Sequence, residues 1–538
     1  MPFFCTTSPS ASQTFLSVRF NAVCKGSQTR MSVLLRIVKA SIILLALLLA
    51  TMRLPAQSLP QNTTPIRIGS KAFTESVILG EILKQRVSTR FHATHTKQLG
   101  GTRILWNALR AGEIDAYPEY TGTIRAEILA GRNVEDASDS ALHAALHREG
   151  IEMSAPLGFA NTYAIGMRSE TAQKLGIRTI SDLARFPDLH AAFSNEFMDR
   201  HDGWRGLRTY YALPHKDVRG LEHDIAYRAL ADGTIDFTEL YSTDAEIAEY
   251  NLTILQDDRH FFPDYRCVVL HRNSIPPEAA STLALLEGRI SQKTMTQMNA
   301  EAKLRKTPEE RIAARFLQEQ FRQTASPLNF DDKTLAERVL ARTAEHLRLT
   351  AVSLCAAILV AVPLGVIAAR FRRVGAVVVS FAGIVQTIPS LALLVMMIPL
   401  FGIGAPPAML ALFLYSLLPI IRSTMIGITT IPPSLTEAAQ ILGASNRTRL
   451  FRIELPLAAP VLLSGIKTAA VINVGTATLG AIIGAGGHGQ PILTGIRLAD
   501  TALILEGAVP AAFLALAVQW LFDTLEHGFG RFFATPID

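Results

Sequence analysis

The sequence predicts two folded parts: a two-lobed α/β domain over residues 64–326 and an all-α, polytopic membrane domain over residues 335–538. Three observations support this. The 538 residues exceed what one hydrophobic core usually serves. Charged residues make up only 18% of the chain, below the roughly 25% that is typical of soluble domains. The deficit lies in residues 347–538, which are apolar and rich in Gly and Ala, whereas residues 66–326 are normally charged.

The N-terminus combines a polar extension with an apolar segment. Residues 1–32 are rich in Ser and Thr, and we predict that this extension is disordered. Residues 33–54 carry basic side chains followed by an apolar core of about signal-peptide length, from Ala40 to Ala50. A signal peptide and a signal anchor both fit this pattern. Either one predicts that the α/β domain is exported.

The α/β domain alternates strand-like with helix-like runs. Helices are expected over Thr74–Val87 and Thr102–Ala111. The strand candidates are IRIGS (66–70), IDAYPEY (114–120), YAIGM (163–167), AAFS (191–194), LTILQ (252–256) and CVVLH (267–271). Such alternation predicts mainly parallel sheets. Two lobes of this kind would hold a ligand between them, at the strand ends.

The membrane domain contains five apolar stretches, near residues 347–369, 374–399, 407–421, 457–483 and 503–522. If the α/β domain is exported, five crossings place Arg370, Arg372 and Arg373 inside, together with the Arg-bearing segment 422–456. Basic residues prefer the cytoplasmic side, so charge and parity agree. We therefore expect a multi-pass membrane protein whose α/β domain lies on the extracytoplasmic side.

The net charge of +6 does not predict a nucleic-acid partner, because the visible basic clusters flank apolar spans. The four cysteines have neither metal nor redox spacing. We find no catalytic constellation, no metal or cofactor motif and no phosphate-binding G-x-x-x-x-G-K-[ST] loop. The chain is therefore not expected to be an enzyme or to hydrolyse ATP itself.

Segment 422–456 carries an informative order of residues. A small-residue patch, a helix-breaking glycine and a closing Leu-Pro follow one another in EAAQILGASNRTRLFRIELP (437–456). This order resembles the coupling loop of ABC importer permeases, which docks on a separate ATPase. The resemblance assigns the contact to Glu437, Ala438, Ala439, Gly443, Leu455 and Pro456.

Further motifs extend the resemblance over residues 66–538. They are Ser70-Lys-Ala-Phe-Thr-Glu75, Leu99-Gly-Gly-Thr102, Tyr117-Pro-Glu-Tyr-Thr-Gly-Thr123, Asn161-Thr-Tyr163, Asp202-Gly-Trp-Arg-Gly206, Tyr241-Ser-Thr-Asp244 and, in the membrane half, Gly475-Thr-Ala-Thr-Leu-Gly480. Together they resemble osmoprotectant importers for glycine betaine, carnitine and choline, some of which fuse receptor and permease. The resemblance implies a type II-like periplasmic-binding-protein fold joined to an ABC importer permease domain, working as a homodimer. It also implies a place in the bacterial inner membrane, with the binding domain on the periplasmic side.

A quaternary ammonium cannot donate a hydrogen bond, so a receptor holds it by cation–π attraction inside an aromatic cage. By resemblance, the cage rings are Tyr120, Tyr163 and Tyr241, with Trp204 where the family usually has Tyr. Each ring alone would more often be core packing, but four rings at four motif positions favour the cage.

Three polar residues are candidates for orienting the ligand. Thr123 follows Tyr120 and Asn161 precedes Tyr163, and both offer short polar side chains for a ligand carboxylate or hydroxyl. Arg103 could pair with a ligand carboxylate. A turn hydroxyl, a strand-end cap and a solvated arginine are the structural alternatives.

The expected function is uptake of quaternary-ammonium compatible solutes. Two alternatives remain open at this stage. The same architecture could import another betaine such as ergothioneine, or the exported domain could belong to a ligand sensor or gated channel.

Overall fold

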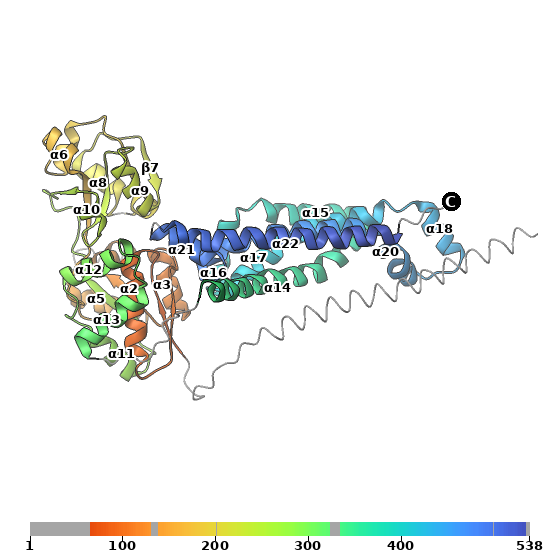
Figure 1. Ribbon diagram of the computed structural model, residues 1–538, viewed down its shortest axis with the longest axis horizontal. Helices are drawn as coiled ribbons and strands as arrows, with labels where there is room; N and C mark the ends of the chain where they lie inside the picture. The colour runs from red at the N-terminus through yellow and green to blue at the C-terminus, as the bar shows by residue number, and fades with distance from the viewer. Residues whose placement is uncertain (1–64, 131–137, 201, 323–333, 499, 534–538) are drawn as a thin grey trace, which may run out of the picture.

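The computed structural model describes residues 65–130, 138–200, 202–322, 334–498 and 500–533. The predicted extension 1–32 and the signal segment 33–54 lie outside these residues. In the described part, two α/β lobes lie at one end of an elongated bundle of helices (Figure 1). This agrees with the predicted fold class.

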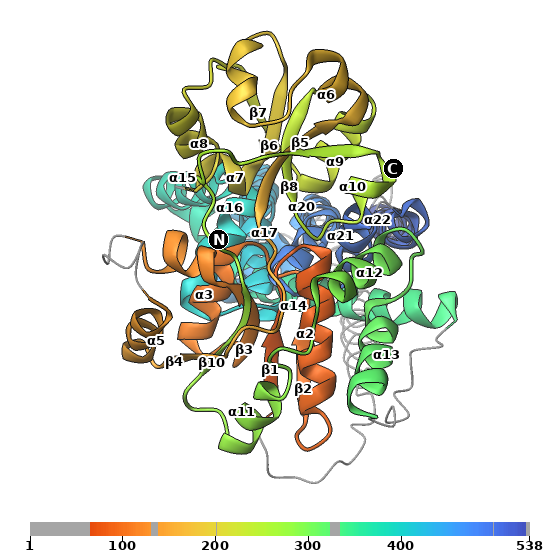
Figure 2. The ribbon, with the colours of Figure 1, turned by 90° about the vertical axis from the view of Figure 1, so that its left-hand side faces the viewer.

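Each lobe is built on a five-stranded sheet, and Figure 2 shows the two sheets one above the other. In lobe 1 the strand order is β2 (Ala93–Thr96), β1 (Ile66–Gly69), β3 (Ala116–Tyr120), β10 (Cys267–Arg272) and β4 (Ile151–Met153). In lobe 2 it is β7 (Val218–Leu221), β6 (Ala191–Ser194), β8 (Phe237–Tyr241), β5 (Tyr163–Arg168) and β9 (Leu252–Leu255).

Helices cover both sheets. Lobe 1 carries α2 (Thr74–Val87), α3 (Thr102–Ala111), α4 (Thr121–Thr123), the π-helix η1 (Ile124–Ile128), α5 (Asp139–Arg148), α11 (Pro277–Ala284), α12 (Gln292–Lys303) and α13 (Glu309–Phe321). Lobe 2 carries α6 (Ser169–Leu175), the 3-10 helix η2 (Ser181–Arg185), α7 (Asn195–Asp199), α8 (Trp204–Tyr211), α9 (His223–Ala231) and α10 (Glu246–Glu249). The two helices predicted from sequence, α2 and α3, have the expected bounds.

The prediction of mainly parallel sheets is wrong, because two of the four pairings in each sheet are antiparallel. The chain crosses between the lobes twice, through residues 154–162 and 256–266. These crossings are joined by backbone hydrogen bonds, among them Asn161 N to Tyr265 O at 3.0 Å. β5 and β10 begin at the crossings and run away from them, whereas β3 and β8 end there, so these neighbours must pair antiparallel.

The membrane domain is all-helical. Its elements are α14 (Leu335–Arg370), α15 (Arg372–Thr387), α16 (Ser390–Phe401), α17 (Ala405–Thr429), α18 (Pro433–Ile441), α19 (Asn446–Arg449), the π-helix η3 (Leu450–Glu454), α20 (Leu455–Ala477), the 3-10 helix η4 (Thr478–Ile483), α21 (Gly489–Arg497) and α22 (Thr501–Phe533). Among the described residues, four helical stretches are long and apolar enough to cross a membrane, and a fifth crossing is possible if the bent pair α15–α16 is one span. Five spans thus remain compatible with the structure.

The second predicted span, 374–399, is not a straight helix. It bends by 92° between α15 and α16. Ile388 adopts an extended conformation, with φ −68° and ψ 126°, directly before Pro389. The ring of a proline clashes with a helical conformation of the preceding residue, which explains the break.

The connection between α17 and α20 is shorter than the predicted coupling segment 422–456. Residues up to Thr429 still belong to α17, and α20 begins at Leu455. The connection itself is therefore 430–454, with α18, α19 and η3 inside it. It lies at the end of the bundle opposite to the lobes (Figure 1).

Candidate functional site

A cluster of aromatic rings lies where the two lobes meet. Tyr120 ends β3, Tyr241 ends β8 and Tyr163 begins β5, so the strand register brings all three to the crossing. The ring centroids of Tyr163 and Tyr241 are 5.3 Å apart. Two of the four predicted cage rings are therefore in direct contact, and Tyr120 ends its strand at the same crossing.

Phe73, which precedes α2, joins the rings of the two lobes. Its centroid lies 6.3 Å from that of Tyr120 in lobe 1 and 5.5 Å from that of Tyr241 in lobe 2. Tyr265 and Phe197 add further rings beside Tyr163, at 5.5 Å and 5.0 Å. Sequence reasoning missed these three, although Phe73 stands inside the Ser70–Glu75 motif and could have been found there.

Trp204, the fourth predicted wall, lies at the start of α8 and is 4% exposed. Its ring packs on Phe193 at 4.7 Å and on Phe237 at 6.4 Å, inside lobe 2. It reaches the Tyr163 ring through Phe193 and Phe197 in turn. Its role as a cage wall stays a prediction.

Of the three predicted polar residues, two are buried and one is exposed. Asn161 is 7% exposed and lies at the crossing, and Thr123 is buried in the short helix after Tyr120. The Arg103 side chain is 64% exposed and forms an ion pair with Glu127 at 3.3 Å. The structure therefore brings Asn161 to the crossing, buries Thr123 in the helix that follows Tyr120 and leaves Arg103 on the surface of α3.

Glu75 links the ring cluster to both lobes and was also missed. Its carboxylate accepts hydrogen bonds from the Tyr120 hydroxyl at 2.6 Å and from Asn161 Nδ2 at 3.0 Å. It also accepts from Asn299 Nδ2 at 3.1 Å and, across the lobes, from the Thr243 hydroxyl at 2.5 Å. Burial raises the pKa of Glu75, and the hydrogen bonds oppose that shift.

A cationic imidazole lies behind Tyr241. His223 stacks on the Tyr241 ring with centroids 4.1 Å apart and an interplanar angle of 20°. Burial opposes its charge, but hydrogen bonds to Asp244 at 3.0 Å and Glu239 at 3.2 Å outweigh burial and raise the pKa of His223 to about 10. One face of the Tyr241 ring is thus covered by the His223 imidazole.

A second group of contacts holds the lobes together outside the rings. Thr102 Oγ1 in lobe 1 donates to Glu196 Oε1 in lobe 2 at 3.1 Å. Lys303 of α12 forms ion pairs with Asp224 at 2.6 Å and with Glu246, both in lobe 2. Polar contacts outside the ring cluster therefore also join the two lobes.

The second predicted site, the coupling segment, is largely exposed. Glu437 and Ala438 lie on the exposed face of α18, whereas Ala439 and Pro456 are buried. Gly443 has φ +78°, and a Cβ at this position would meet open space, as expected for a glycine that ends a helix. Next to it, Ile441 is 86% exposed and Leu442 is 59% exposed.

Comparison with known proteins agrees with this division. Residues 64–319 match the family described as the substrate-binding domain of ABC-type glycine betaine transport systems. Residues 361–531 match the inner membrane component of binding-protein-dependent transport systems. The fold and the sites thus define a permease that carries its own substrate-binding domain.

Individual relatives narrow the class. The choline transport system permease protein OpuBB of Bacillus subtilis is 39% identical over 195 residues, which is 36% of this chain and 90% of the relative. The osmoprotectant import permease protein OsmW of Salmonella typhimurium is 42% identical over 189 residues, 34% of this chain and 88% of the relative. A solved glycine betaine/carnitine/choline ABC transporter structure is 30% identical and covers 47% of this chain and 98% of its own, with a TM-score of 0.40. The chain belongs to the osmoprotectant ABC importer permeases and contains their substrate-binding domain in the same polypeptide.

Proposed function

We propose that this chain binds and imports quaternary-ammonium compatible solutes of the glycine betaine, carnitine and choline class. The observation that carries the proposal is the gathering of Tyr120, Tyr163 and Tyr241 at the junction of the lobes. Ring faces attract a cation that cannot donate hydrogen bonds, with about 0.5 to 2 kcal/mol per ring. The names of the relatives, which include choline and glycine betaine systems, point the same way.

A separate ATPase supplies the energy in this proposal. The exposed apolar side chains Leu435, Ile441, Leu442 and Phe451 lie on the segment 430–454, at the end of the bundle away from the lobes. Exposed apolar side chains gathered on one short segment are typical of a protein contact. Two copies of the chain would form the pathway, with the lobes on the periplasmic side and the segment 430–454 in the cytoplasm.

Ligand binding to the full chain tests the proposal. Purified protein in lipid nanodiscs is titrated calorimetrically with choline, glycine betaine, carnitine and ergothioneine. We expect saturable binding of at least one of the first three. Binding of ergothioneine alone would replace the ligand class, and binding of none of the four would refute the proposed function.

The ATPase contact is tested separately. The full chain is used to capture an ATPase from the membranes of its own source, and the captured ATPase is identified by its nucleotide hydrolysis. Removal of segment 430–441 should abolish capture. Capture that persists without this segment would place the contact elsewhere.

A further inference from the structure

The lobes contact the membrane domain through lobe 1. Ile403, between α16 and α17, packs against the apolar cluster of lobe 1 that contains Leu99 and Leu105. Gly484 approaches Thr96 and Leu99 so closely that an added Cβ would lie 2.8 Å and 3.2 Å from their side chains. The Lys306 ammonium donates to the Leu498 carbonyl oxygen.

Arg497, at the end of α21, is a buried charged group of this contact. It is 4% exposed and forms an ion pair with Glu309, which begins α13 in lobe 1. It also donates to the Thr74 hydroxyl at 3.0 Å. With the Gln98 amide turned to satisfy its neighbours, the amide oxygen accepts from Arg497 Nε and Nη2 at 3.2 Å.

Burying a guanidinium costs several kcal/mol of free energy, unless an opposite charge and hydrogen bonds compensate for the lost water. Undocking lobe 1 would separate Arg497 from Glu309, Thr74 and Gln98 together. The contact is therefore expected to persist.

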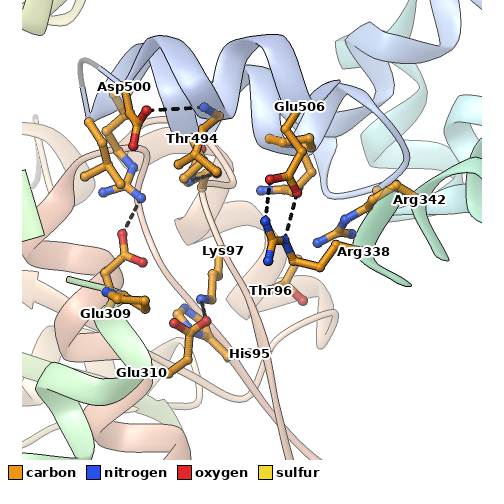
Figure 3. A pocket seen from close by; sticks show the side chains of 18 of the residues that line it. His95, Thr96, Lys97, Glu309, Glu310, Arg338, Arg342, Thr494, Asp500 and Glu506 are labelled. Atoms are coloured by element: carbon orange, nitrogen blue, oxygen red, sulfur yellow. Dashed lines mark hydrogen bonds and ion pairs between the residues drawn. The ribbon is translucent and has the colours of Figure 1, made fainter. Parts of the chain in front are cut away.

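Beside this contact lies a cavity of about 1000 Å³ between lobe 1 and the helices α14, α21 and α22 (Figure 3). Its lining is rich in charged side chains, including Lys97, Glu310 and Arg338, so water can fill it without loss of apolar burial.

Lobe 2 is placed differently. Within the described ranges, the hydrogen bonds and ion pairs that join the two domains end on lobe 1. Figure 1 shows lobe 2 standing beyond the end of the bundle. Lobe 2 is held to lobe 1 by the two crossings, by the rings and by a few polar pairs such as Thr243 with Glu75.

We propose that lobe 1 stays docked on the permease, anchored by Arg497, and that the receptor opens and closes by moving lobe 2 alone. Ligand capture then needs no undocking. The proposal rests on the proposed function only for the ligand that triggers closure, because the anchoring contact itself involves no ring of the cluster.

Distances between spin labels test the proposal on the full chain in nanodiscs. In a cysteine-free background, a label at Ala502 of the permease is paired with a label at Ala144 in α5 of lobe 1, or at Lys174 in α6 of lobe 2. All three positions are exposed. Choline, glycine betaine and carnitine serve as ligands. We expect the 174–502 distance to change with ligand and the 144–502 distance to stay narrow and unchanged.

A ligand-dependent shift of the 144–502 distance as large as that of 174–502 would overturn the proposal. If no ligand binds, the proposed function fails. The docking of lobe 1 then still predicts that the distribution of label distances is broader for 174–502 than for 144–502. Equal widths would then overturn it.

Variants of the anchor complete the test. Arg497→Met and Glu309→Gln remove the ion pair from opposite sides, so both should broaden the 144–502 distribution. Arg342→Met is the matched control, because Arg342 pairs with Glu345 of its own helix at 3.0 Å. We expect ligand affinity to stay within about threefold of the parent in both anchor variants. An unchanged 144–502 distribution in both would show that Arg497 is not the anchor.

Discussion

Tyr163 is the residue whose surroundings favour the cage most directly, since its ring neighbours Tyr241, Phe197 and Tyr265. Cation–π attraction comes from the ring face and not from the hydroxyl. Tyr163→Phe should therefore weaken choline or glycine betaine binding only slightly, whereas Tyr163→Ala should weaken it by about tenfold or more. Calorimetry on the full chain measures both. Parent-like binding by the Ala variant would contradict the cage.

Trp204 needs its own test because the sequence and the packing favour different roles. Its ring contacts Phe193 and Phe237, so Trp204→Phe should lower stability while changing ligand affinity by less than about threefold. Thermal unfolding and calorimetry are compared on the same sample. A loss of affinity as large as that of Tyr163→Ala would restore Trp204 as a wall of the cage.

Glu75 accepts from donors in both lobes, so it should stabilise the closed receptor. Glu75→Gln presents an amide nitrogen to groups that are themselves donors, and we expect about tenfold weaker binding of each ligand. Thr243→Val removes only the hydrogen bond across the lobes and serves as the milder control. If Glu75→Gln binds every ligand as the parent does, Glu75 has no part in closure.

His223 gives a pH dependence with a defined sign. Burial lowers the pKa of His223, but Asp244 and Glu239 outweigh burial and raise that pKa from 6.5 to about 10 in the folded protein. The stability that it contributes is fully present below pH 6.5 and is lost as the pH rises through about 10. The urea midpoint of lobe 2 should therefore fall between pH 6.5 and about pH 10. Trp204 fluorescence reports this midpoint once Trp106 and Trp520 are replaced by Phe.

His223→Gln should remove this fall and lower the midpoint already at neutral pH. The same alkaline fall in both proteins would assign it to other groups.

At the scale of elements, the short helix α18 and the glycine after it are the part of segment 430–454 that we expect to contact the ATPase. Gly443 has φ +78°, which L side chains rarely adopt, and it lies among exposed residues far from the rings. We expect Gly443→Asp to leave ligand affinity unchanged and to abolish ligand-stimulated ATP hydrolysis and uptake in vesicles reconstituted with the ATPase.

Gly383→Ala is a matched control, because Gly383 of α15 also has open space around it but carries no positive φ. Intact transport by the Gly443→Asp variant would show that the segment 430–454 is an ordinary loop.

At the scale of the whole molecule, the five-span arrangement places the two ends of the bundle on opposite sides of the membrane. Arg372 begins α15 and Pro406 lies in the first turn of α17, which follows α16, and both residues are exposed. In a cysteine-free background, a cysteine at position 406 should react with an impermeant reagent in spheroplasts, and one at position 372 should react only after lysis. Labelling of both from outside would rule out a bent pair that crosses the membrane.

The elements and the family could be predicted from the sequence because their signals are local. The apolar spacing of α3 and the left-handed glycine Gly112 that ends it are local signals, and the apolar spans follow from hydropathy. The motif positions of Tyr120, Tyr163 and Tyr241 also lie in the primary structure. These features depend on residues that are close together in the chain.

The tertiary structure decided what depends on distant residues. It brought Phe73, Glu75 and His223 to the rings, left Arg103 on the surface and paired Lys467 of α20 with Asp523 and Glu526 of α22. It also made both sheets mixed and joined Arg497 to Glu309 across 188 residues. Which side chains meet is set by strand direction, by the two crossings and by domain docking, and none of these leaves a periodic signal in the sequence.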